Sequence, residues 1–292
     1  MNKGIKILLI CLVTAAGVAA GYFGAKALLC GKDNGDKQLT IIHLNDTHSH
    51  FEPVSAGEYA GLGGSLERAA FIDSVMNAEG RENVLLLHAG DFSQGSSYFT
   101  EFKGNLEIQE LNALGYDAVT LGNHEFDNGL EDLGRRLSSL ECPVVACNLD
   151  FSPFEAGKYV KPYTIVEKAG LKIGIFGVVC RLKGMVSSEV ADRVPEFDMI
   201  ESAQKYADYL KNEEKCDLVI ALTHLGYEEH TPGDTTDPML VAATRNIDLV
   251  VGGHSHTFLG DLPYHENLDG KKIPVVQDGE YGVQTGILKI KL

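Results

Sequence analysis

The sequence has few positive charges for its length of 292 residues. Lys and Arg number 25 against 41 Asp and Glu, which gives a formal net charge of −16. This balance argues against a nucleic-acid backbone as partner, because such binding requires a basic face. The protein as a whole also repels anionic substrates. Any attraction for such a substrate must be local, and bound metal ions are the expected source of it.

Several common catalytic motifs are missing as well. The sequence contains no Walker loop, no G-x-S-x-G nucleophile elbow, no H-E-x-x-H zinc motif and no C-x-x-C pair. It contains no internal repeat and no low-complexity tract. The chemistry must therefore come from another arrangement of side chains.

Cysteine is scarce, and the protein is not expected to depend on disulfides. Beyond the N-terminal segment, the remaining thiols all lie in or beside apolar runs: Cys142, Cys147, Cys180 and Cys216. The first two flank a strand-like run that would hold them roughly 16 Å apart, whereas a disulfide needs Cα atoms within about 7 Å. We expect buried, reduced thiols, although a bridge between other pairs stays open.

The first 37 residues are predicted to lie outside the folded domain. A short basic segment at residues 1–6 precedes an apolar run at residues 7–16, which is the pattern of an export signal. Apolar character continues far enough for an uncleaved membrane anchor, and the residues before Cys30 weakly resemble a lipid-attachment site. We therefore expect export to the periplasm or cell envelope, with the segment cleaved, lipidated or kept as an anchor.

Residues 38–292 are predicted to form one α/β domain in which strands and helices alternate. Helical spacing of apolar residues covers residues 64–76, a second helix begins near residue 106 and ends at Gly115, and a third covers residues 202–211. Residues 163–167 and 171–179 are separated by a short turn and are expected to form a hairpin.

Five strand-like runs end at side chains that can bind a metal. Asp46 and His48 follow the run at residues 39–44, Asp91 follows residues 84–89, and Asn123 follows residues 117–120. His224 follows residues 217–222, and His254 and His256 follow residues 247–251. In α/β sheets, ligands bind beyond the carboxyl ends of the strands. A polar turn with a hydrogen-bonded histidine could explain one such end. Five such ends would require five independent coincidences. We therefore expect one shared site.

The types of donor indicate which metals would suit this site. Carboxylate, amide and imidazole groups together suit divalent Zn²⁺ or Mn²⁺, and sometimes iron. No cysteine stands at these five ends, which weighs against a structural zinc site. Seven candidate ligands are too many for one tetrahedral ion. They suit two divalent metal ions that share a bridging carboxylate about 3.5–4 Å apart, an arrangement that hydrolyses phosphate esters.

The same residues carry a family resemblance. The blocks Asn45-Asp46-Thr47-His48, Gly90-Asp91, Gly122-Asn123-His124-Glu125-Phe126-Asp127, Thr223-His224 and Gly252-Gly253-His254-Ser255-His256 resemble the signature blocks of the calcineurin-like metallophosphoesterases, and among these the 5′-nucleotidase branch. All five blocks occur in the family's order. The resemblance implies an α/β, four-layer metallophosphoesterase fold, with two packed mixed β-sheets flanked by helices.

The resemblance also implies a role for each site residue. Asp46 and His48 would hold the first metal with His256, in a position that the family fills variably. Asn123, His224 and His254 would hold the second metal, and Asp91 would bridge the two. His124, oriented by Asp127, would stabilise the transition state or assist departure of the leaving oxygen. The longer nucleotidases continue into a second domain that stacks the base and supplies arginines to the phosphate, and the sequence to Leu292 contains no such domain.

We therefore expect a phosphomonoesterase catalytic domain of the nucleotidase type. Alone, it should hydrolyse several phosphomonoesters with similar, modest kcat/KM, and a separate chain that carries the missing domain could restore a preference for nucleotides. Two alternatives keep the metals but change the bond: a cyclic-nucleotide phosphodiesterase, or a sulfur-ester hydrolase of the same superfamily. A third is a metal-binding envelope protein without turnover. The presence of both His124 and Asp127 argues against it, because neither is needed merely to bind metal.

The remaining histidines have less specific interpretations. His43 and His88 lie inside apolar runs and are expected to be packed core residues. His50 could either support the site or lie apart from it. His230 and His265 are expected to be solvated in polar loops.

Overall fold

The computed structural model describes residues 38–291. The predicted export signal, anchor and linker of residues 1–37 lie outside the described residues. In residues 38–291, no helix is both long enough and apolar enough to cross a membrane.

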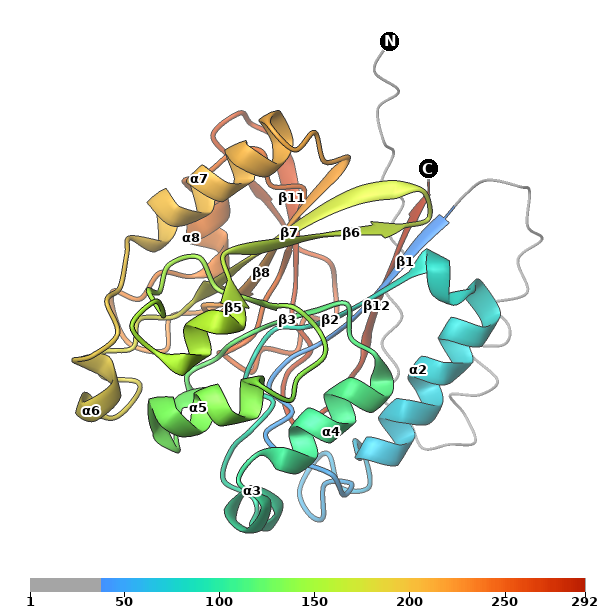
Figure 1. The fold of residues 1–292 in the computed structure, drawn as a ribbon. Helices are drawn as coiled ribbons and strands as arrows, with labels where there is room; N and C mark the ends of the chain where they lie inside the picture. The colour runs from blue at the N-terminus through green and yellow to red at the C-terminus, as the bar shows by residue number, and fades with distance from the viewer. Residues whose placement is uncertain (1–37, 292) are drawn as a thin grey trace.

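Two six-stranded sheets pack face to face at the centre of the molecule (Figure 1). The first has the order β12-β1-β2-β3-β4-β5. Its strands are β1 (Gln38–Leu44), β2 (Val84–His88), β3 (Ala118–Thr120), β4 (Val144–Val145), β5 (Val160–Lys161) and β12 (Gly286–Lys291). The second has the order β10-β11-β9-β8-β7-β6. Its strands are β6 (Tyr163–Lys168), β7 (Leu171–Val179), β8 (Leu218–His224), β9 (Leu249–Val251), β10 (Tyr264–Glu266) and β11 (Lys272–Val276).

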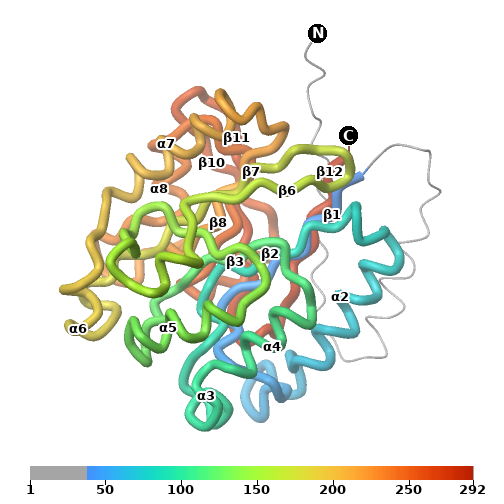
Figure 2. Tube along the Cα trace, viewed as in Figure 1, coloured from blue at the N-terminus to red at the C-terminus, as the bar shows by residue number. Residues whose placement is uncertain are grey.

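Both sheets are mixed. β12 is antiparallel to β1, β6 to β7 and β10 to β11, whereas every other pair of neighbours is parallel. Figure 2 shows the first and last described strands, β1 and β12, side by side at one edge of the molecule. The predicted hairpin of β6 and β7 is confirmed.

Helices cover the outer face of each sheet (Figure 1). The helices on the side of the first sheet are α2 (Ser65–Glu79), α3 (Ser97–Phe102), α4 (Asn105–Leu114) and α5 (Gly129–Leu137). Those on the side of the second are α6 (Ser188–Ala191), α7 (Met199–Asn212) and α8 (Asp237–Ala242). Three short 3₁₀ helices are η1 (Arg81–Asn83), η2 (His124–Phe126) and η3 (Glu155–Lys158). The fold class predicted from the sequence, two packed mixed sheets between helices, is confirmed.

Side chains alternate along each strand, so a single strand contributes residues to two different parts of the core. Leu39 and Ile41 of β1 belong to the core between the sheets, together with Ile220 of β8. Ile42 and Leu44, the other apolar residues of β1, belong to the core beneath the helices. Because successive side chains point to opposite faces and both faces are covered, β1 carries apolar residues on both of its faces.

The predicted helix boundaries are largely right, and their differences have local causes. α4 ends where predicted, because Gly115 takes a left-handed conformation with φ 69°. α7 begins at Met199, earlier than predicted, because the Asp198 side chain accepts a hydrogen bond from the Glu201 amide and caps the helix. β5 and β10 have only two and three residues, too few for a periodic signal.

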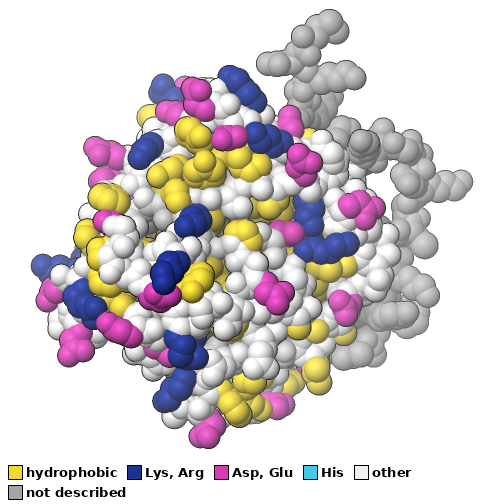
Figure 3. Space-filling model, viewed as in Figure 1, with side chains coloured by type: hydrophobic (Ala, Val, Ile, Leu, Met, Phe, Trp, Pro, Cys, Tyr) yellow, Lys and Arg dark blue, Asp and Glu magenta, His cyan; other side chains and the backbone are white. Residues whose placement is uncertain are grey.

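Charged side chains are spread over the face shown in Figure 3 rather than gathered. On the face shown in Figure 3, basic side chains occur singly or in small groups among acidic ones. On this face, any strong local attraction for an anion must therefore arise at a specific site.

Candidate metal centre

The ends of β1, β2, β3, β8 and β9 bring the predicted side chains to one edge of the two sheets. Two groups form there: one of Asp46, His48 and His256, the other of Asp91, His224 and His254. In each group, one donor atom from every residue lies within 4.8 Å of the others. The two groups adjoin, because His224 Nε2 lies 3.0 Å from Asp91 Oδ2 and 3.8 Å from Asp46 Oδ1.

Buried donor atoms converge in this region without hydrogen bonds to satisfy them. Asp46 Oδ1 and His254 Nε2 are buried and have no hydrogen-bond partner among residues 38–291. Asp46 Oδ1 lies 3.4 Å from His256 Nε2 and 3.7 Å from His48 Nε2. Buried polar atoms that lack a partner are costly, and a cation bound among them would remove that cost. The donors present therefore fit divalent metal ions.

Hydrogen bonds on the far side of two histidines support this fit. His224 Nδ1 contacts the carbonyl oxygen of Ala89 at 2.7 Å. His256 Nδ1 contacts Glu280 Oε2 at 2.9 Å. Metal-binding histidines commonly donate their second ring N–H to such a carbonyl or carboxylate, which leaves the other nitrogen free for the metal.

Asn123 lies directly before η2 and is partly fixed by a thiol. Cys180 Sγ lies 3.9 Å from Asn123 Oδ1, and the backbone N–H of His124 donates to Asp91 Oδ1 at 2.8 Å. Cys180 follows β7, a strand whose end the sequence analysis did not associate with the site. The thiol is buried, and burial raises its pKa well above the ordinary value.

The backbone at the site takes conformations that most residues avoid. In the described part of the chain, eleven residues other than glycine have positive φ, and five of these are candidate ligands: Asp46, His48, Asp91, His254 and His256. A non-glycine residue in this region costs on the order of 1–3 kcal/mol and persists only where the surroundings impose it. The concentration of such residues here indicates that the fold is built to aim these side chains.

The carboxylates and imidazoles of these two groups shift one another's pKa values. Burial alone would lower the pKa of His224, but the carboxylates of Asp91 and Asp46 outweigh it and raise the pKa to about 10. Burial disfavours the charged form of Asp91, yet the nearby His224 holds the pKa of that carboxyl well below its usual range. Burial lowers the pKa of His254 to about 4. Metal binding to such a cluster would release the proton held by His224.

Glu125 fixes two of the ligand-bearing turns, a role that the sequence analysis missed. This fully buried carboxylate accepts hydrogen bonds from the backbone N–H groups of Asp91 and Gly122 at 2.8 and 2.7 Å. It also accepts from the N–H and the hydroxyl of Ser93 at 3.1 and 2.9 Å. Burial, with the adjacent Asp91 charge, raises the pKa of Glu125 to about 7. The buried Arg136 donates to the Glu125 carbonyl oxygen.

The approach of these turns leaves no room for a side chain at Gly122. A Cβ atom added there would lie 2.1 Å from Asp91 Oδ1 and 2.6 Å from His224 Nε2. Only glycine lets the end of β3 come this close to the candidate ligands from β2 and β8.

Asn45 fixes the first turn against a distant loop. Its Nδ2 donates to Asp46 Oδ2 at 2.6 Å and to the carbonyl oxygen of Gly279 at 2.7 Å. Its Oδ1 accepts from the backbone N–H of Asp278 at 2.8 Å. These bonds tie the carboxylate of Asp46 to a loop more than two hundred residues away in sequence.

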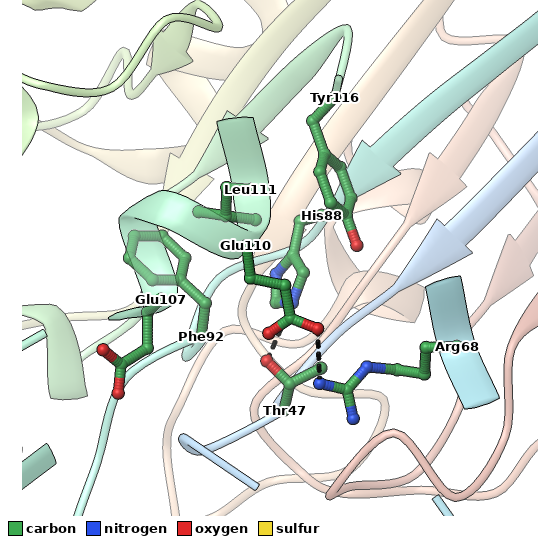
Figure 4. Close-up of a pocket in the computed structure, with 8 residues that line it drawn as sticks. All are labelled: Thr47, Arg68, His88, Phe92, Glu107, Glu110, Leu111 and Tyr116. Carbon is green, nitrogen blue, oxygen red and sulfur yellow. Dashed lines mark hydrogen bonds and ion pairs between the residues drawn. The ribbon is translucent and has the colours of Figure 1, made fainter. Parts of the chain in front are cut away.

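A polar cluster lies behind the turn that carries Asp46 and His48 (Figure 4). Arg68 donates to Glu110 at 2.8 Å and to the carbonyl oxygen of His50 at 3.0 Å. Thr47 Oγ1 lies 3.2 Å from His88 Nε2. Burial lowers the pKa of His88 to about 3, so this imidazole is neutral. The cluster surrounds a cavity of about 10 Å³ and supports the ligand turn from beneath.

His124 and Asp127 form the predicted pair. His124 Nδ1 lies 2.9 Å from Asp127 Oδ2, and the two side chains are 26% and 35% exposed. The rings of His124 and His48 meet edge to face, with centroids 5.4 Å apart. An imidazole held by a carboxylate therefore stands beside the candidate metal centre and is partly exposed to solvent.

The other histidines are placed as follows. His43 and His88 are buried, as predicted. His50 lies beside the site, because its Nδ1 contacts the His48 carbonyl oxygen at 2.9 Å. The prediction for His265 is wrong, because it lies on β10 and contacts the Tyr227 hydroxyl at 3.2 Å. His230 is exposed, as predicted, although its ring centroid is 5.2 Å from that of His254.

Comparison with known proteins gives consistent matches. The family described as calcineurin-like phosphoesterase matches residues 39–258. A 5′-nucleotidase of Rattus norvegicus is 36% identical over 276 residues, and a probable 5′-nucleotidase of Treponema pallidum is 37% identical over 258 residues. The crystal structure of a 5′-nucleotidase precursor from Thermus thermophilus superposes with a TM-score of 0.76 at 34% identity.

These matches cover most of the chain but only part of each relative. They cover 87% of this chain and 46% of the Rattus protein, 85% and 40% for the Treponema protein, and 86% and 51% for the Thermus structure. The chain thus spans about half the length, or less, of the proteins that it matches.

Proposed function

Because the chain belongs to the calcineurin-like phosphoesterase family, we propose that it is a dinuclear-metal phosphomonoesterase that acts on nucleotides. The observation that carries this proposal is the convergence of two groups of carboxylates and imidazoles, all buried except the half-buried His256, at one edge of the sheets. The similarity to 5′-nucleotidases supports nucleotides as the substrate class.

In this proposal, the seven predicted ligands divide between two ions. Asp46, His48 and His256 would hold one ion, while Asn123, His224 and His254 would hold the other, with Asp91 shared. Oxygen and imidazole donors without thiolate favour Zn²⁺ or Mn²⁺, with iron as a third candidate. Two bound divalent ions supply Lewis-acid stabilisation of phosphoryl oxygens and a nucleophile at neutral pH.

The protein's own residues would complete the chemistry. The Asp127 carboxylate holds Nδ1 of His124, which leaves Nε2 as the atom that donates a proton to the leaving oxygen or stabilises charge on the phosphoryl group. Glu125 keeps the turns of Asp91 and Gly122 in place. Asn45 and Glu280 orient Asp46 and His256.

Relative rates on three ester classes test the proposed substrate. The purified protein, supplied with Mn²⁺ or Zn²⁺, should hydrolyse nucleoside monophosphates faster than cyclic nucleotides or thiosulfonate esters. A faster reaction with cyclic nucleotides would identify a phosphodiesterase, and one with thiosulfonates a sulfur-ester hydrolase. Stoichiometric metal binding without turnover of any of them would identify a binding protein.

We also propose that the protein is exported and retained in the cell envelope through its N-terminal segment, as the basic and apolar pattern of that segment suggests. A separate chain with the nucleotidase C-terminal domain is the partner that the proposal allows. N-terminal sequencing of protein from fractionated cells would locate the mature start, and recovery of the full chain from the cytoplasm would contradict export.

A further inference from the structure

A loop near the C-terminus borders the first group of candidate ligands. The backbone N–H of Tyr281 donates to the carbonyl oxygen of Asp46 at 2.7 Å. Its neighbour Glu280 contacts His256 at 2.9 Å. Two ligands of the same group are therefore connected to two adjacent residues of this loop, so the loop forms part of the wall of the site.

Tyr281 is held in an unusual conformation that points its ring at the site. Its φ is 60°, in the left-handed region that bulky residues rarely adopt. The ring stacks at a tilt on His50, with centroids 3.9 Å apart, and meets the edge of His48 at 5.9 Å. It remains partly exposed. An aromatic ring thus stands in a fixed orientation beside a candidate metal ligand.

A second aromatic pair fixes the other side of this loop. Phe258, two residues after His256, stacks on Tyr59 with centroids 4.9 Å apart. A Cβ atom added to Gly279 would lie 2.2 Å from the Phe258 ring, so this ring packs directly on the loop backbone. The position of Tyr281 is therefore determined from both sides.

The rings of His124 and Tyr281 both border the His48 ring, so Tyr281 lies near the residue proposed to assist the leaving oxygen. His124 and Tyr281 both contact the His48 ring, with centroids 5.4 and 5.9 Å from it. The centroids of the His124 and Tyr281 rings can therefore lie no further apart than the sum of their distances to the His48 ring. If the organic group of a leaving oxygen at His124 extends along this wall, a planar group on a short linker meets the Tyr281 ring.

We propose that Tyr281 is a specificity-determining residue that stacks on the planar aromatic part of the leaving group, as a nucleoside base would provide. This inference rests on the proposed phosphomonoesterase function and deepens it. Stacking on an aromatic side chain is tolerant of base identity, because every base has a π-face. Tyr281 therefore favours nucleoside monophosphates over alkyl phosphates, with little discrimination among the bases.

The test compares kcat/KM for a nucleoside monophosphate with that for glycerol phosphate, in the full chain supplied with Mn²⁺. Tyr281→Asn removes the ring but keeps a residue that tolerates the left-handed conformation. It should lower the ratio of the two kcat/KM values about tenfold, near the lower end of what loss of base stacking gives. Tyr281→Phe should keep the ratio within about twofold, as a conservative ring replacement.

Tyr264→Asn is the matched control, because Tyr264 is 46% exposed on the edge strand β10. It should leave the ratio unchanged. If Tyr281→Asn does not fold, Tyr281→Gly, which adopts positive φ freely, takes its place. An unchanged ratio, or an equal loss of both rates, would overturn the role of Tyr281 while leaving the phosphomonoesterase proposal intact. A wild-type protein that hydrolyses neither ester would overturn both.

Discussion

Replacement of Glu125 by Gln tests whether this buried carboxylate positions the metal-binding turns. One carboxylate oxygen accepts from the backbone N–H groups of Asp91 and Gly122, and the other accepts from the N–H and hydroxyl of Ser93. Gln keeps the shape but turns one acceptor into a donor. In the less costly orientation, the new NH₂ group faces Ser93, where the hydroxyl can rotate but the backbone N–H loses its acceptor.

The number of donors left without an acceptor sets the expected loss of unfolding free energy. One buried donor left without a partner costs about 1–3 kcal/mol, so Glu125→Gln should lower the free energy of unfolding by about that amount. The other orientation would leave two donors unpaired and cost more. Because Asp91 is tied to Glu125 through its backbone, affinity for metal should also fall, by about 10–100-fold as for other outer partners of metal ligands.

Urea unfolding of the metal-free protein and titration with Zn²⁺ or Mn²⁺ measure the two effects. Glu131→Gln is the matched control, because the Glu131 side chain is 77% exposed on α5 and pairs with the exposed Arg193. Its unfolding free energy should change by less than about 0.5 kcal/mol. A Glu125→Gln variant with wild-type stability and wild-type metal affinity would refute the reasoning.

Three further predictions concern other parts of the molecule. His124→Ala should lower turnover by about 10²–10⁴-fold while the metal content, measured by mass spectrometry, stays near that of the wild type; loss of both ions would show that His124 is a ligand. Burial raises the pKa of Asp237 to about 7, despite the opposing hydrogen bond from Thr223. Its unfolded value is about 3.9, so the native state binds the extra proton and stability should fall as pH rises between about 4 and 7. Asp237→Asn should flatten that slope in urea unfolding of the metal-free protein, and a slope like that of the wild type would contradict the assignment. Burial raises the pKa of Cys147 to about 12, and Cys180 is also buried. Iodoacetamide at pH 8 should therefore modify the peptides of both only after denaturation, and rapid labelling of the native protein would contradict their burial.

Much of the fold could be predicted from sequence because its signals are local. Apolar runs of strand length marked β1, β2 and β8, and polar residues directly after each run marked the edge at which they meet. The resemblance to the calcineurin-like phosphoesterases rested on those same residues and is confirmed by the comparisons.

The parts that sequence could not supply depend on contacts between distant segments. Glu125 stands between His124 and Phe126 in one of the blocks that resemble the family. Nothing in the sequence shows that it is buried among backbone donors from the turns that follow β2 and β3. Tyr281 lies 235 positions after Asp46, and only the folded chain shows their hydrogen bond. His265 was misplaced because a three-residue edge strand carries no periodic pattern.

The most direct test of the central claim is the metal content of the purified protein, measured together with its activity on an aryl phosphate. The two groups of candidate ligands predict close to two divalent ions per chain. Activity should disappear on chelation and return when Mn²⁺ or Zn²⁺ is added. A fully folded protein that binds no divalent ion, and that stays inactive after both metals have been added, would contradict the account.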